Sequence, residues 1–184
     1  MNRIVVLASN LFGYLFLALS VLVTVETLAR KLFNMSLQGA DELGGYALAV
    51  GSSIAFAIAL LGRSHIRIDL VHRLLPTTAR ALLNWLSYLL MTLFALLLAW
   101  VCWTVVVDTL AYRSTAPTPW ATPLIYPQSV WYAALALFAL VAVIMTLRAS
   151  YLLLRGRLQA LDREFEPKGA LEELKEELED VTRR

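Results

Sequence analysis

Long apolar runs separated by short polar connections dominate the first 150 residues of the chain. A run of about 20 apolar residues can cross the roughly 30 Å hydrocarbon core of a membrane as a helix. We expect helices because a spanning segment must satisfy its own backbone hydrogen bonds, and the runs lack the period-two alternation of barrel strands. Four runs are long enough, and the predicted spans are residues 4–25, 43–61, 82–107 and 127–147.

Composition supports a membrane protein, since 59% of the 184 residues are hydrophobic and 16% are charged. Soluble domains are about 45–50% apolar and about 25% charged. The first run has Arg3 before it, as a secretory signal peptide would, but it exceeds the usual core of 7–15 residues and shows no small-x-small site before Glu26. We therefore expect a retained helix and an all-α integral membrane protein.

The composition shifts abruptly after the fourth run, so we divide the chain into a transmembrane domain over residues 1–155 and a charged cytoplasmic tail over residues 156–184. Apolar residues recur in the tail at helical spacing; they are Leu171, Leu174, Leu178 and Val181. This pattern predicts a solvated helix of about 15 residues, which is marginal without a partner. The alternative is a docking helix for a cytosolic surface or for the tail of another copy.

The connections differ in charge. Residues 108–127 hold one basic residue, Arg113, opposite Asp108, whereas residues 62–81 hold one acid, Asp69, and six basic or histidine residues: Arg63, His65, Arg67, His72, Arg73 and Arg80. Cytoplasmic loops carry an excess of lysine and arginine. We therefore predict that residues 62–81 and both termini are cytoplasmic.

The segment after the second run reads GRSHIRIDL and continues as VHRLLP. Its end and this continuation place four apolar residues on one helical face: Leu70, Val71, Leu74 and Leu75. This pattern predicts a short interfacial helix on the cytoplasmic side. Asp69 is placed to cap its start, and Pro76 suits its end.

The other two connections have different features. Residues 113–127 contain four prolines, which favour extended or turned backbone, and interfacial aromatic residues surround them. We predict a stiff outer loop on the membrane surface. Asp41 and Glu42 open the second span, where carboxylates complement the helix dipole. Glu26 and Arg30, one helical turn apart, form either a local ion pair or a contact to another protein.

Candidate chemistry is sparse. Cys102 is the only cysteine, which excludes disulfides within the chain, and no phosphate-binding glycine loop or nucleophile elbow is found. We expect no catalytic residue, no metal, no cofactor and no nucleic-acid partner. Two alternatives stay open: an electron-transfer subunit with His65 and His72 as haem ligands, and a small exporter that dimerises.

Four fragments of the sequence together resemble one known family. They are ETLARKLFNMSL at the end of the first span, DELGGYALAVGSSIAF at the start of the second, HIRIDLVHRLLP after it, and TPLIYPQSVWY before the fourth. In this order and spacing, over about residues 4–150, the chain resembles the small membrane subunit (Q type) of tripartite ATP-independent periplasmic, or TRAP, transporters. It departs from the family pattern mildly, at Asp41, Ile68 and Tyr126.

The resemblance implies a scaffold subunit in a bacterial inner membrane. Its partners would be membrane lipids, a large multi-span permease, which holds the substrate and sodium sites, and a periplasmic binding protein, which delivers an organic acid. Arg30, Asp41 and Glu42 would fix the outer ends of the first two helices. His65 and Asp69 would hold the cytoplasmic loop to its neighbours, and the proline-rich loop would help to dock the binding protein.

Overall fold

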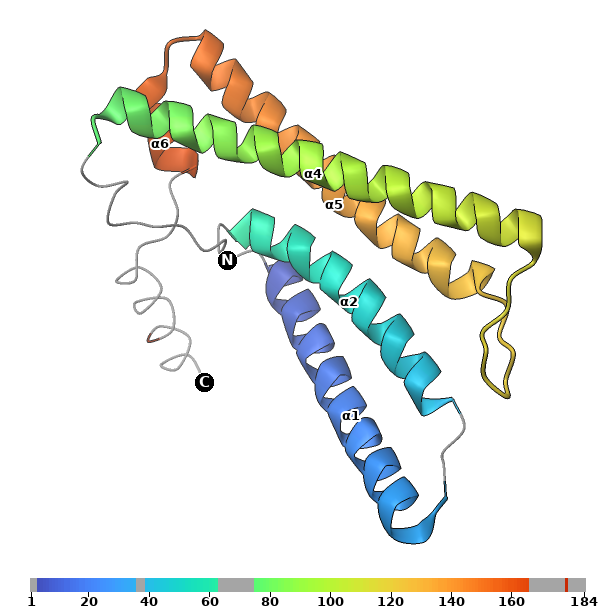
Figure 1. The fold of residues 1–184 in the computed structure, drawn as a ribbon. Coiled ribbons are helices and arrows are strands. Elements are labelled where there is room, and N and C mark those ends of the chain that lie inside the picture. Colours follow the sequence, from blue (N-terminus) through green and yellow to red (C-terminus); the bar gives the residue numbers. More distant parts are fainter. Residues whose placement is uncertain (1–2, 36–38, 63–74, 166–177, 179–184) are drawn as a thin grey trace. The chain divides into compact units, whose positions relative to one another are not determined.

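The computed structural model describes residues 3–35, 39–62, 75–165 and 178, and the elements in these ranges are α-helices (Figure 1). They are α1 (Arg3–Phe33), α2 (Ala40–Gly62), α4 (Thr77–Tyr112), α5 (Ile125–Leu154) and α6 (Leu158–Phe165). Among the described helices, α1, α2, α4 and α5 are long and apolar enough to cross a membrane. The prediction of an all-α integral membrane protein with four spans is thereby confirmed. The interfacial helix predicted at residues 70–75 and the tail helix lie almost wholly outside the described residues.

Each long helix contains one predicted span and extends beyond it. At 1.5 Å per residue, the 36 residues of α4 reach about 54 Å, well beyond the roughly 30 Å hydrocarbon core. The extension is possible because the helical hydrogen bonds do not depend on a lipid environment. At the end of α1, Asn34 takes a left-handed conformation (φ 51°), and the N–H of Met35 donates to the carbonyl of Ala29 over 3.3 Å. This arrangement is the usual way of ending a helix.

The chain forms two compact units. The first unit comprises residues 1–58 and 94–140, and the second comprises residues 59–93 and 141–184. The helices α2, α4 and α5 each contribute residues to both units.

In the first unit, α1 and α2 form an antiparallel helical hairpin (Figure 1). Gly51 of α2 lies so close to the ring of Phe16 that a Cβ atom there would be 2.5 Å from the ring's Cζ. Most of α1 is exposed, with only 6% of its most apolar stretch buried. The rings of Trp103 and Tyr132, 5.4 Å apart, join α4 to α5.

The connection between α4 and α5 is a compact turn in the first unit. Thr115 and Pro123 form an antiparallel bridge, and the N–H of Ala116 donates to the carbonyl of Thr122 over 2.9 Å. This is the turned backbone that the prolines predicted. The Trp120 ring lies against Gly39, where any Cβ atom would approach it to 2.6 Å. Gly39 also has a φ of 91°, so both its space and its backbone favour glycine.

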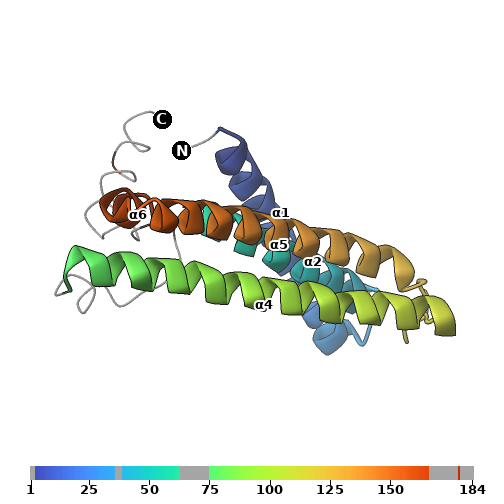
Figure 2. The same ribbon diagram turned by 90° about the horizontal axis from the view of Figure 1, so that it is seen from above.

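In the second unit, α4 and α5 again run side by side (Figure 2). The Thr146 hydroxyl donates to the carbonyl of Tyr88 over 2.9 Å, so its oxygen accepts from the Thr92 hydroxyl, 2.7 Å away. Both hydroxyls are buried. Neutral hydrogen bonds of this kind join neighbouring helices in membranes.

The helix α6 also belongs to the second unit. Its apolar positions Leu161 and Phe165 are buried, and the Phe165 ring meets the Tyr88 ring edge-on at 4.9 Å. The first residues of the segment expected to be a solvated tail therefore pack against α4.

Candidate subunit-contact site

The end of α1 and the start of α2 carry charges of opposite sign. Arg30 and Lys31 lie in the last turn of α1, and Asp41 and Glu42 lie in the first turn of α2. Each pair complements the partial charge of its own helix end, where cations favour the C-terminus and anions the N-terminus. The hairpin brings these two ends together, so the helix dipoles and the side chains favour the same arrangement.

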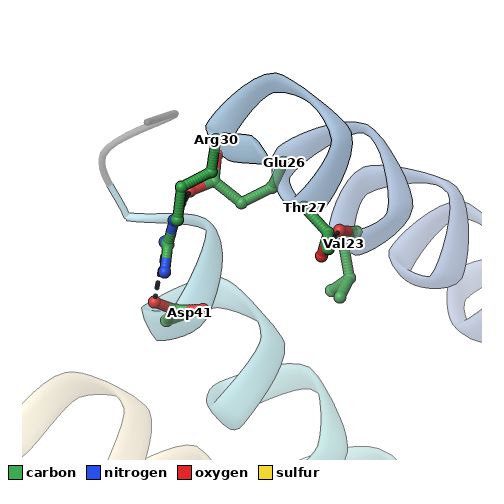
Figure 3. Close-up of polar contacts among 5 residues, drawn as sticks. All are labelled: Val23, Glu26, Thr27, Arg30 and Asp41. Carbon is green, nitrogen blue, oxygen red and sulfur yellow. Dashed lines mark hydrogen bonds and ion pairs between the residues drawn. The ribbon is translucent and has the colours of Figure 1, made fainter. Parts of the chain in front are cut away.

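Arg30 connects the two helices (Figure 3). Its Nη2 lies 2.6 Å from Oε1 of Glu26, and its Nε lies 3.2 Å from the same oxygen. The same Nη2 lies 3.5 Å from Oδ2 of Asp41, at the start of α2. The guanidinium thus lies between a carboxylate of its own helix and one of the next.

The two contacts of Arg30 differ in strength. The Glu26 side chain is 4% exposed and that of Asp41 is 79% exposed. Among the α1 residues whose burial is described, Glu26 is the only buried one. A buried carboxylate is costly unless it is paired, whereas a long contact to an exposed carboxylate contributes little. The pairing with Glu26 is therefore the principal role of Arg30, and Asp41 adds a weak tie to α2.

The same residues line an open recess of about 280 Å³. Its charged groups are two carboxylates and two cations, so the recess is formally neutral. The residues around it are Val23, Glu26, Thr27, Arg30, Lys31, Ala40 and Asp41. The volume suits a side chain or a few water molecules. A polar group that binds there could accept hydrogen bonds from Arg30 and donate them to Asp41.

Glu42 follows Asp41 but has different surroundings. It is 7% exposed, and its Oε1 accepts a hydrogen bond from the Tyr46 hydroxyl over 3.0 Å. Within the described part of the chain, its other oxygen, Oε2, is buried and has no hydrogen-bond partner. The hydrogen bond between Glu42 and Tyr46 thus connects the first two turns of α2, and Oε2 of Glu42 is still able to accept another.

The predicted site residues fall into three groups. Arg30 and Asp41 are in contact. Arg30 also contacts Glu26, the partner for Arg30 that the sequence predicted. Glu42 is buried and is hydrogen-bonded to Tyr46, whereas Arg30 contacts Glu26 and Asp41. His65 and Asp69 lie outside the described residues, as does His72, on which the haem alternative depends.

A second polar cluster, in the second unit, was missed by sequence reasoning. Oδ2 of the buried Asp162, on α6, lies 2.8 Å from Nη2 of Arg80, and its Oδ1 accepts from Nδ2 of Asn84 over 3.2 Å. Two signals point to this cluster. Asn84 is an amide inside an apolar run, and Leu158, Leu161 and Phe165 have helical spacing around Asp162.

Four long apolar helices, with their described ion pairs near helix ends, define a multi-pass integral membrane protein. The chain belongs to the family of the tripartite ATP-independent periplasmic transporters, DctQ component, whose model matches residues 19–151. This confirms the family expected from the sequence, the small permease component of TRAP transporters. The match ends before α6. No curated protein and no solved structure compared with the chain matches it.

Proposed function

We propose that the chain is the scaffold subunit of a TRAP transporter that imports organic acids together with sodium ions. A large multi-span permease carries the substrate and the ions, and a periplasmic binding protein delivers the substrate. The observation that carries this proposal is the family match over residues 19–151.

The character of the helices supports a scaffold role. The spans over residues 43–61, 82–107 and 127–147 contain no Lys, Arg, Asp or Glu. Ionisable residues within membrane helices usually mark substrate or ion routes. The exposed apolar surface of α1 fits contact with lipid and with a larger membrane partner.

We assign contact roles to the candidate residues. Arg30 and Asp41, with Glu26, present a fixed polar group beside the recess, while Glu42 stabilises the first turn of α2. His65 and Asp69 hold the second connection to the neighbouring helices or to the permease. The compact turn at residues 113–124, with Trp120 on Gly39, forms part of the docking surface for the binding protein.

We place the chain in the bacterial inner membrane with both termini cytoplasmic. Residues 62–81 are then cytoplasmic, and residues 108–127 face the periplasm together with the recess at Arg30. The charge asymmetry of the connections supports this orientation. The contact between Gly39 and Trp120 agrees with four crossings, because the two connections that carry these residues then lie on the same side of the membrane in either orientation.

Reconstitution of the transporter in liposomes tests the proposal. We expect uptake of a labelled carboxylate to require this chain, the large permease, the binding protein and an inward sodium gradient. Calorimetry on the isolated chain should show no saturable binding of the same carboxylate. Equal uptake without the chain would contradict the scaffold role. Uptake by the chain alone would favour the exporter, and a Soret band in the purified chain would favour the haem protein.

A further inference from the structure

The turn that joins α5 to α6 presents two arginines. The N–H groups of Gly156 and Arg157 donate to the carbonyls of Leu153 and Leu152, each over 3.0 Å, and Gly156 has a φ of 66°. This left-handed glycine ends α5. It leaves Arg155 and Arg157 exposed on either side of the turn.

Arg155 and Arg157 differ from two other arginines of the second unit, Arg80 and Arg148. Arg80 is paired with Asp162, and Nε of Arg148 lies 2.5 Å from Oε1 of Glu164. In the described part of the chain, neither Arg155 nor Arg157 forms an ion pair. Among the residues that the structure describes, no carboxylate therefore compensates the two positive charges of this turn.

The Arg155 guanidinium is held in a defined position. It lies over the ring of Tyr151, one turn earlier in α5, at 4.9 Å from the ring centre. Stacking on an aromatic ring uses the face of the guanidinium and leaves the N–H groups at its edge free. Those groups match the oxygens of a phosphate, to which arginine can donate two parallel hydrogen bonds.

The depth of the turn in the membrane indicates which phosphate it meets. Arg148 is the only charged residue in α5, whose 30 residues reach about 45 Å. A bilayer is about 40–45 Å thick including its headgroups, so the end of α5 lies among them. Leu154, the last residue of α5, is 88% exposed, and Tyr151 is also exposed. An exposed leucine and tyrosine next to unpaired arginines fit the boundary between acyl chains and headgroups.

We propose that Arg155 and Arg157 form a binding site for the phosphate headgroup of an anionic phospholipid, with Leu154 in contact with its acyl chain. The site lies outside the family match, which ends at residue 151. It anchors the end of α5 at the membrane surface and so fixes the depth of α6 relative to the headgroups. The assignment does not depend on the transported substrate or on the large permease.

The test uses the purified full-length chain in mixed micelles with dioleoylphosphatidylglycerol, with dioleoylphosphatidylcholine, or with sodium phosphate alone. Native mass spectrometry counts the retained lipids, and thermal unfolding measures stabilisation. We expect phosphatidylglycerol to be retained and to raise the Tm, and neither phosphatidylcholine nor phosphate to do so. The double variant Arg155→Gln/Arg157→Gln should bind phosphatidylglycerol on the order of 20-fold more weakly, since each basic residue near the surface contributes to the attraction.

A matched control removes the same charge elsewhere. Lys31→Gln/Arg113→Gln also deletes two exposed cations, but from the first unit. It should keep wild-type binding, and Arg155→Lys/Arg157→Lys should keep most of it. Equal loss in the control would show non-specific attraction and overturn the site. So would equal retention of both lipids by the unaltered chain, or equal stabilisation by phosphate, whether or not the glutamine variant folds.

Discussion

The Arg30 guanidinium neutralises the buried carboxylate of Glu26 across 2.6 Å, within one turn of α1. Arg30→Gln should therefore lower the thermal stability of the purified chain more than Lys31→Gln does, because it leaves a buried carboxylate without its cation. Glu26→Gln in the Arg30→Gln background should recover part of the loss. Asp41→Asn should have a small effect, since Asp41 is exposed and 3.5 Å away.

The same variants separate a structural role of this pair from a contact role. If Arg30 also contacts the large permease, Arg30→Gln/Glu26→Gln should copurify less permease than the wild-type chain at a temperature where both are folded. Wild-type yields of permease with the double variant would limit Arg30 to a structural role within the chain.

The approach of Phe16 to Gly51 predicts a sharp dependence on side-chain size. Gly51→Leu should destabilise the chain by about 1–3 kcal/mol, as overpacking usually does, because a Cβ atom would lie 2.5 Å from the ring. Gly45→Leu is the matched control, since a Cβ atom there would meet no described atom within 4 Å other than its chain neighbours and the nearby backbone of its own helix. Thermal unfolding in detergent measures both. Phe16→Ala should rescue Gly51→Leu if the ring causes the clash, and a lack of rescue would place the clash elsewhere.

The contact between Asp162 and Arg80 predicts that α6 is part of the folded second unit. Asp162→Ala should destabilise the chain by about 1.5–3 kcal/mol, the usual contribution of a hydrogen bond to a charged group, because it removes the contacts of the buried Asp162 carboxylate with Arg80 and Asn84. It should also make residues 156–165 sensitive to protease. Glu164→Gln should cost less, since its pairing with Arg148 is more exposed. Proteolysis at wild-type rates in Asp162→Ala would show that α6 docks without this contact.

The proposed orientation predicts the outcome of reporter fusions. A reporter active only in the periplasm should be silent when fused after Arg184 and active when inserted near Thr118. A reporter active only in the cytoplasm serves as the control and should give the opposite pattern. Activity of the periplasmic reporter at Arg184, with silence at Thr118, would reverse the orientation.

The spans could be predicted from the sequence because a run of 20 apolar residues has few alternatives to a membrane helix. The pairing of Glu26 with Arg30 could also be predicted, since residues four apart lie on the same face of a helix. The contact of Arg30 with Asp41 was harder to predict, because it depends on how α1 and α2 pack in the hairpin. Nothing in the sequence distinguished the exposed Asp41 from the buried Glu42 beside it.

The packing of α6 was missed because its signal is weak in any local pattern. Its three large apolar residues lie among polar and charged residues, and its eight residues would be marginal as an isolated helix. The partners that hold it lie far away in sequence, since Asn84 and Asp162 are 78 positions apart along the chain. The periodicity of apolar residues predicts which face of a helix is buried. It does not predict which residue will pair with a carboxylate on that face.

The long separation between Arg80 and Asp162 also sets an order of events during synthesis. Residue 162 leaves the ribosome after α4 and α5 have both been made. Until then the contact that secures α6 cannot form, however far membrane insertion has advanced. A chain that stops after α5 would contain the four long helices but lack the contact between Arg80 and Asp162. The missing contact is a physical difference by which a cell that degrades unfinished membrane proteins could recognise such a chain.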